Sequence, residues 1–156
     1  MKRPLEIVFG TKGETLQRLD SVVQRSYVLP LVVLTVEQWN VDKGAVLEKI
    51  LEKLGPSKLL IRSSATAEDT ASSSNAGAFL SIGEVRGDDQ KGLSKAINTV
   101  ISSYGGYGPY DQVIAQHQLT NVDLAGVFFS RDLETLSAYT IFNYDDQSGK
   151  TNLVTS

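Results

Sequence analysis

The sequence predicts an α+β fold in which mixed or antiparallel sheets are flanked by helices. Segments with helical and strand-like patterns interleave along the first part of the chain, whereas strand-like segments cluster towards its end. The length of 156 residues suits about one domain, and a chain of this size can bury a substantial core without disulfides or metals.

The first predicted elements are a helix and a strand. Apolar residues recur at helical spacing over residues 11–26, with Thr11 as the expected N-cap and Glu14 three residues later, as in a capping box. Residues 27–35, YVLPLVVLT, are aliphatic and β-branched, which predicts a strand buried on both faces. Because Pro30 cannot donate a backbone hydrogen bond, it restricts this segment to an edge position or marks a strand entry.

The remaining elements alternate until the chain becomes rich in strands. After residues 36–39, VEQW, the apolar face of residues 42–55 predicts the clearest helix of the chain. A strand over residues 58–64 then leads into a polar loop that runs to about Asn75. The later predicted elements are the strand 77–85, the helix 88–105 and the strands 111–119, 123–132 and 137–146.

The composition excludes several classes of function. The net charge is −3, from 15 basic and 18 acidic residues, so there is no basic excess for general nucleic-acid binding. Cysteine is absent, which excludes disulfides and thiolate chemistry and fits a cytoplasmic location. The N-terminal apolar run is too short for a signal peptide, and no apolar run approaches the roughly 18 residues of a membrane-spanning helix.

Arg62 and the polar loop behind it form the most unusual stretch, LLIRSSATAEDTASSSNAG. Arg62 follows three apolar residues near the end of a predicted strand, where open α/β sheets often place ligand sites. Its guanidinium can fork onto phosphate oxygens, and the loop hydroxyls and amides can wrap a phosphate chain or close over a nucleotide. A surface arginine followed by a flexible solvent loop explains the same composition.

Lys12 and His117 are candidates on local grounds. Lys12 lies between two glycines just before a predicted helix, which suits either an anion site or a plain turn. The stretch GTKG lacks the spacing of a Walker A motif. His117 is the only histidine, and a structural or surface role is expected for it. No histidine or carboxylate cluster in the sequence has metal-ligand spacing, and no Gly-x-Ser-x-Gly nucleophile motif is present.

Taken in order, these pieces are similar to a known family. The stretches that carry the resemblance are, in order, FGTKGETLQRL, VLPLVVLTVEQW, LLIRSSATAEDTASSSNAGAFLSI, VIAQHQL and DLAGVFFSRD. With them the chain resembles the N-terminal ATP-binding domain of the phosphoenolpyruvate synthase and pyruvate phosphate dikinase family. The most specific element is RSSATAED with AGAFLS after it. The resemblance covers the chain from about residue 8 to residue 156. It implies that residues 1–156 are the N-terminal part of an ATP-grasp-like domain, which is incomplete here.

The resemblance also implies an ATP site between two lobes. Lys12 is similar to the family's glycine-flanked lysine at the nucleotide phosphates, and Arg62 to the arginine that orients those phosphates. Gly77 and Ser81 match the segment that closes over ATP, and Gln116 matches a glutamine beside the adenine. Two cations, close backbone approach at a glycine and an amide suited to a base edge are compatible with these roles.

The chain also departs from the family pattern. The residues after Gln116 are HQL, whereas the family usually has Pro-Met or a similar pair at this place. The family's glutamate, glutamine and arginine that hold Mg²⁺ and the terminal phosphate lie beyond a VTSG segment, and this chain ends at Ser156. The resemblance implies that the phospho-histidine and pyruvate-binding domains lie outside these 156 residues, and His117 does not match the phospho-histidine. The expected cofactor is ATP, with Mg²⁺ in the complete enzyme, and the chain alone is expected to be inactive.

Three functions are consistent with these residues. The first is the ATP-binding portion of a phosphotransferase, or kinase, that moves phosphate from ATP through a histidine on another domain to an acceptor such as pyruvate. The second is a non-catalytic nucleotide-binding or regulatory module that retains the fold. The third is a structural or interaction domain. Expected partners are the nucleotide and the missing C-terminal domains, and neither nucleic acid nor a membrane is expected.

Overall fold

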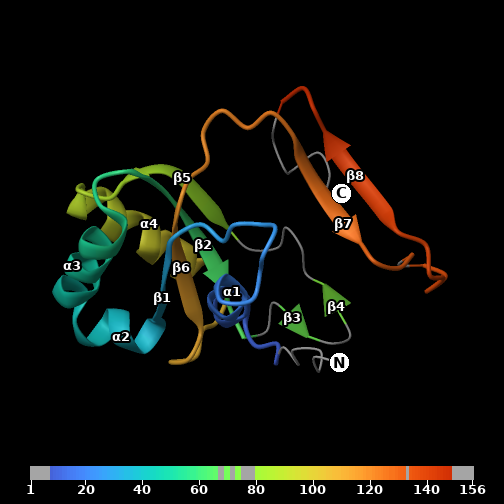
Figure 1. Ribbon diagram of the computed structural model, residues 1–156. Coiled ribbons are helices and arrows are strands. Elements are labelled where there is room, and N and C mark those ends of the chain that lie inside the picture. Colours follow the sequence, from blue (N-terminus) through green and yellow to red (C-terminus); the bar gives the residue numbers. More distant parts are fainter. Residues whose placement is uncertain (1–7, 67–68, 71–72, 75–79, 133, 149–156) are drawn as a thin grey trace. The chain divides into compact units, whose positions relative to one another are not determined.

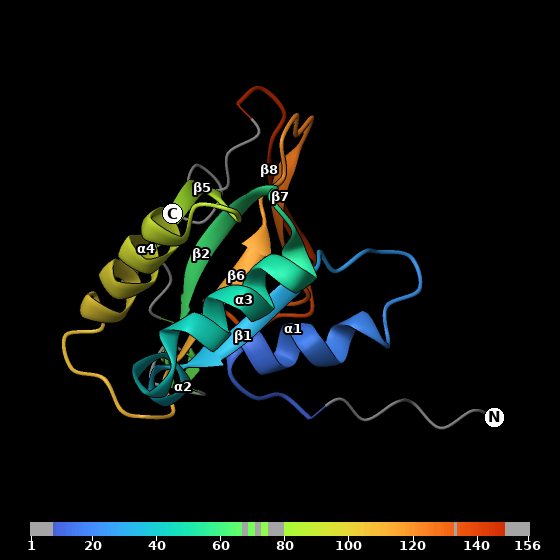
Figure 2. The same cartoon turned by 90° about the vertical axis from the view of Figure 1, so that its left-hand side faces the viewer.

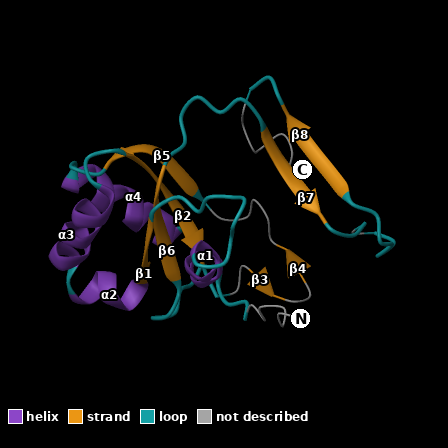
Figure 3. Cartoon of the chain, viewed as in Figure 1, coloured by secondary structure: helices purple, strands orange, loops and turns teal. Residues whose placement is uncertain are grey.

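The computed structural model shows an α+β protein with antiparallel sheets and flanking helices, as the sequence predicts (Figures 1 and 3). It describes residues 8–66, 69–70, 73–74, 80–132 and 134–148. In chain order the elements are α1 (Lys12–Asp20), β1 (Leu31–Thr35), α2 (Val36–Val41), α3 (Lys43–Leu54), β2 (Lys58–Ser64), β3 (Asp69–Thr70), β4 (Ser73–Ser74), β5 (Ser81–Arg86), α4 (Gln90–Ser102), β6 (Gln112–His117), β7 (Ala125–Phe129) and β8 (Ile141–Asp145).

The chain divides into two compact units, the first ending at Gln118 and the second beginning at Leu119. The first unit is built on a four-stranded sheet with the order β1-β6-β2-β5, in which every neighbouring pair is antiparallel. The strands β3 and β4 form a separate two-stranded pair. Since β1 and β5 occupy the two edges, the central strands β2 and β6 carry neighbours on both sides.

One face of the four-stranded sheet is covered by α3 and α4 (Figure 2). Strand residues at every second position point to this face and join the apolar stripes of the helices. The resulting core contains Val32, Leu34, Val36, Trp39, Val46, Leu47, Ile50, Leu54, Leu59, Ile61, Val85, Leu93, Ala96, Ile97, Val100, Ile101, Val113 and Ala115. Apolar burial on this face therefore supplies the main stabilisation of the unit.

Pro30 marks a strand entry and an edge strand at once. β1 begins at the residue after Pro30 and lies at the edge of the sheet, so both outcomes expected of this proline are confirmed. The strand prediction over residues 58–64 matches β2 at both ends. The two long helices are also confirmed, with ends within three residues of the predicted ones.

One local prediction in this region was wrong, and one helix was missed. The predicted helix over residues 11–26 ends at Asp20, because Ser21 caps it and a β-branched pair, which favours helix weakly, follows. Residues 36–39, for which no element was predicted, begin α2. Its Thr35 side chain accepts from the Gln38 amide while Gln38 reaches back to Thr35, which is a capping box.

The polar loop after β2 contains the short pair of β3 and β4. The next predicted strand, 77–85, is observed from Ser81 to Arg86 as β5. Gly77, one of the residues assigned by the family resemblance, lies outside the described residues.

A close backbone contact joins the turn after α3 to the turn after β5. Gly55 ends α3 with a φ of 64°, in the left-handed region that glycine adopts without strain. Gly87 follows β5, and its amide donates to the Ser57 carbonyl at 3.0 Å. A Cβ atom at Gly87 would lie 2.0 Å from the Gly55 carbonyl oxygen, so only glycine allows the two turns to meet.

The second unit contains the antiparallel pair of β7 and β8. Phe128 lies opposite Phe142, and Gly126 lies opposite Tyr144 on the same face. The Phe142 and Tyr144 rings stack with centroids 5.6 Å apart. Within the described residues, none of the helices in either unit has the length and apolar character needed to cross a bilayer.

Candidate nucleotide-binding face

Three of the predicted site residues lie on one face of the four-stranded sheet. Arg62 in β2 pairs directly with Ser81 in β5 and with Ile114 in β6. Residues two apart in a strand share a face, so Gln116 lies on the same face as Ile114 and diagonally across from Arg62. The predicted cation, hydroxyl and amide are therefore brought together from three adjacent strands.

This face is the one opposite the helices α3 and α4. The core side chains of β2 and β6 are those of Leu59, Ile61, Val113 and Ala115, which alternate with the residues of the candidate site. We call the second face, which carries Arg62, Ser81 and Gln116, the Arg62 face. His117 lies on the opposite face of β6, the one covered by the helices. Its Nε2 lies 2.8 Å from the carbonyl oxygen of Leu54, in the last turn of α3. The structural role expected for His117 fits this contact.

Helix α1 begins on the Arg62 face. A Cβ atom at Gly13 would lie 2.9 Å from a methyl carbon of Val33, which shows how closely the first turn approaches the sheet. The Gly13 amide donates to the Ser64 hydroxyl at 2.9 Å. Lys12, the first residue of α1, is thereby held next to β2, two strand positions, or about 7 Å, from the level of Arg62.

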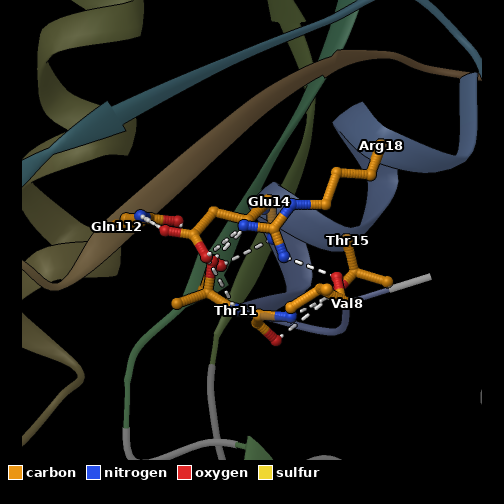
Figure 4. Close-up of polar contacts among 9 residues, drawn as sticks. Val8, Thr11, Glu14, Thr15, Arg18 and Gln112 are labelled. Atoms are coloured by element: carbon orange, nitrogen blue, oxygen red, sulfur yellow. Dashed lines mark hydrogen bonds and ion pairs between the residues drawn. The ribbon is translucent and has the colours of Figure 1, made fainter. Parts of the chain in front are cut away.

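A network of polar side chains surrounds the first turn of α1 (Figure 4). Thr11 donates from its hydroxyl to the Gln112 side-chain oxygen at 2.6 Å, and Gln112 donates to Glu14 at 3.3 Å. Thr11 and Glu14 also form the predicted capping box. Arg18 completes the network through an ion pair with Glu14 at 3.6 Å.

This network changes the expected electrostatics of the GTKG stretch. The backbone amides of Thr11, Gly13 and Glu14 already donate to acceptors within the protein. The Glu14 carboxylate also lies at the helix N-terminus, where it neutralises part of the positive end of the dipole. An anion at this end of the sheet would therefore be attracted by the Lys12 and Arg62 side chains more than by the helix itself.

Arg62 differs from Arg18 and Arg86 of the first unit in its surroundings. Arg86 in the neighbouring strand pairs with Asp88 at 2.6 Å, and Arg18 pairs with Glu14. In the part of the chain that the structure describes, no carboxylate forms an ion pair with Arg62, which is half-buried. A partly buried guanidinium without a neutralising carboxylate favours the binding of an external anion.

Asp111 anchors the start of the polar loop to the sheet. One carboxylate oxygen accepts from both the amide and the hydroxyl of Thr66 at 2.7 Å, and the other accepts from the Gly108 amide at 2.8 Å. Burial alone would raise the pKa of Asp111, but the hydrogen bonds from Thr66 and Gly108 outweigh it and hold the pKa below its ordinary value. The ionised form of Asp111 therefore fixes where the loop leaves β2.

Replacing Asp111 with asparagine is expected to lower the free energy of unfolding by about 1–3 kcal/mol near neutral pH, since charged hydrogen bonds are lost. A lowered pKa in the folded state means that Asp111 contributes stability above its unfolded pKa of about 4, and that this contribution is lost as the pH falls through the folded value. Urea unfolding between about pH 3 and pH 7 should show the wild type and the Asp111→Asn variant converging at the acid end. A constant difference across that range would contradict this role.

Three site residues were not predicted from the sequence: Ser64, Gln112 and Asp111. Ser64 follows Arg62 at strand spacing, so the alternation of β2 would have placed both on one face. Gln112 and Asp111 could not be identified from local patterns, because the contacts that give them a role in the site are to Glu14 and Thr66, which are 98 and 45 positions away. No group of three or more histidine, aspartate or glutamate side chains suited to a metal ion occurs among the described residues.

No family model, curated protein or solved structure matches the chain. Its function is therefore inferred from the arrangement of its residues.

Proposed function

We propose that the chain is the ATP-binding portion of a phosphotransferase that resembles phosphoenolpyruvate synthase or pyruvate phosphate dikinase, with an ATP-grasp-like fold. The observation that carries the proposal is the order of groups along the Arg62 face. Lys12 lies at one end, Arg62 and Ser81 lie in the middle, and Gln116 follows one step further along β6. This order matches a nucleotide, whose phosphates need cations at one end and whose base needs an amide at the other.

Each group on the Arg62 face suits one part of ATP. Arg62 would bind phosphate oxygens bidentately, and Lys12 would add a second positive charge. Ser81, which is exposed, offers a hydroxyl donor directly opposite Arg62. The amide of Gln116 could both donate to and accept from a base edge, but the residue is only 7% exposed, so a base must displace the groups that cover it. When bound, ATP supplies the transferable phosphoryl group.

The chemistry assigned to this chain is binding and orientation. Phosphoryl transfer depends on positioning and on metal-assisted neutralisation of charge. Mg²⁺ is expected with the nucleotide, and no metal ligand is assigned to the described residues. We place the acceptor histidine on another domain, as the family resemblance implies.

A non-catalytic nucleotide-binding or regulatory module is the second candidate. The observation that favours it is the self-capped first turn of α1, whose amides of Thr11, Gly13 and Glu14 donate to protein acceptors. A phosphate would then be held by side chains alone, which suits reversible binding as well as catalysis.

Nucleotide binding itself is tested by thermal unfolding and titration calorimetry. We expect ATP with Mg²⁺ at millimolar concentration to raise the melting temperature of the intact chain, increasingly with concentration, because a ligand that binds only the folded state stabilises it. Inorganic sulfate serves as the control for a non-specific anion. The absence of both a thermal shift and binding heat with ATP would reject the proposal.

A further inference from the structure

Ser64 and Gln112 face each other across β2 and β6 on the Arg62 face. Both are nearly inaccessible, since Ser64 is 0% and Gln112 8% exposed. Burying two polar side chains in a sheet is costly unless each makes hydrogen bonds. Both make them to the same partner, the first turn of α1.

The contacts of this pair fall on both sides of Lys12. Ser64 accepts from the amide of Gly13, which follows Lys12, at 2.9 Å. Gln112 accepts from the hydroxyl of Thr11, which precedes Lys12, at 2.6 Å. With both neighbours held, the backbone of Lys12 has a fixed place relative to the sheet.

The close approach of α1 to the sheet depends on the same pair. A Cβ atom at Gly13 would lie 3.2 Å from the Gln112 side-chain oxygen as well as 2.9 Å from Val33. Gly13 is the one buried residue among the described residues of α1, so the first turn is where the helix packs most closely on the sheet. A shift of this turn would move Lys12 while leaving Arg62 in its strand.

We propose that Ser64 and Gln112 are a positioning pair that sets Lys12 at a fixed place relative to Arg62, so that both cations act on one nucleotide phosphate chain. This inference rests on the proposed function. The link is direct, because Ser64 and Arg62 are alternate residues of one strand, with Cα atoms about 7 Å apart. The pair therefore ties the helix that carries one cation to the strand that carries the other.

The decisive experiment compares two buried serines. Ser64→Ala removes the acceptor for Gly13, whereas Ser63→Ala changes a serine that is 2% exposed and falls on the opposite parity of β2. Both variants are first checked by urea unfolding, and the dissociation constant for ATP with Mg²⁺ is then measured by calorimetry. We expect Ser64→Ala to weaken ATP binding about fivefold or more, as the loss of one hydrogen bond predicts, and Ser63→Ala to leave it unchanged.

A double-mutant cycle separates positioning from general stability. Ser64→Ala should have no further effect on ATP affinity in a Lys12→Ala background, because the residue that it positions is already gone. Because both backgrounds should bind ATP weakly, the cycle is measured by calorimetry at raised ATP concentrations, where Ser64→Ala should keep its effect in the Arg62→Ala background. Gln112→Met, which removes the hydrogen bonds at similar volume, is the second variant and should behave as Ser64→Ala does. It provides the same test if Ser64→Ala does not fold.

The outcomes distinguish this inference from the proposed function. Absence of ATP binding by the wild type overturns both. Binding by the wild type with unchanged affinity in Ser64→Ala and Gln112→Met overturns the positioning pair alone. Equal weakening by Ser63→Ala and Ser64→Ala also overturns it, because the effect would then follow from lost stability.

Discussion

Replacing Arg62 with alanine is expected to abolish the thermal shift caused by ATP with Mg²⁺. The guanidinium is half-buried on the Arg62 face, and among the described residues no carboxylate neutralises it. A charged hydrogen bond contributes about 1.5–3 kcal/mol. Losing the hydrogen bonds from the Arg62 guanidinium to the phosphates should therefore weaken ATP binding by about tenfold to more than a hundredfold. Calorimetry of Arg62→Ala beside the wild type measures this loss directly. Lys12→Ala should abolish the shift as well.

Arg86→Ala is the matched control for this prediction. Arg86 lies in the adjacent strand β5 and is exposed, and its charge is already paired with Asp88. Removing it changes the net charge by the same amount and should leave nucleotide affinity unchanged. Arg62→Lys adds a second comparison, since it keeps the charge but loses the planar fork and should bind with intermediate affinity. Equal effects of Arg62→Ala and Arg86→Ala would point to net charge instead of a site.

Replacing Gly87 with alanine should destabilise the protein by about 3 kcal/mol or more, because the new methyl group would meet backbone that cannot rotate away. The Cβ atom would lie 2.0 Å from the Gly55 carbonyl oxygen, and Gly55 itself is fixed by its φ of 64° at the end of α3. Relief requires the two turns to separate, which would also strain the hydrogen bond from Gly87 to Ser57. Urea unfolding should show the loss as a lower midpoint or as failure to fold.

Gly106→Ala provides the control for the glycine experiment. Gly106 is exposed and has no positive φ. A Cβ atom there would have no heavy atom within 4 Å, apart from those of its own residue and the two adjacent ones. Its replacement should be neutral or slightly stabilising, since alanine reduces the freedom of the unfolded chain. If Gly87→Ala were as harmless as Gly106→Ala, the result would contradict the close contact between the two turns.

The fold was predictable where capping residues and apolar periodicity agreed. In α3 and α4 the apolar stripe and the N-capping aspartates Asp42 and Asp89 indicate the same start. In α1 the spacing of Val22 and Val23 continued past the true end at Asp20, because periodicity alone does not report where a helix stops. The missed helix α2 carried a local signal, the pair Thr35 and Gln38.

The candidate site was predictable only in part. Arg62 was a candidate from its place near the end of a predicted strand, whereas Ser81 and Gln116 were named from the family resemblance. Strand alternation is sufficient to place all three on one face once the pairing is known. The pairing itself joins residues far apart in sequence, so neither the Ser64 and Gln112 pair nor the Asp111 anchor could be derived from local patterns. Their roles depend on β6 lying beside β2.

The alternation of β2 has a consequence for how this protein can change in length. Ile61 packs in the core, and Arg62 points to the opposite face. Deleting or inserting one residue within the strand would exchange the two faces, placing a guanidinium among aliphatic side chains and an isoleucine on the Arg62 face. Insertions that a natural relative of this chain tolerates should therefore fall in turns such as the exposed stretch at Gly105 and Gly106, and never inside β2 or β6.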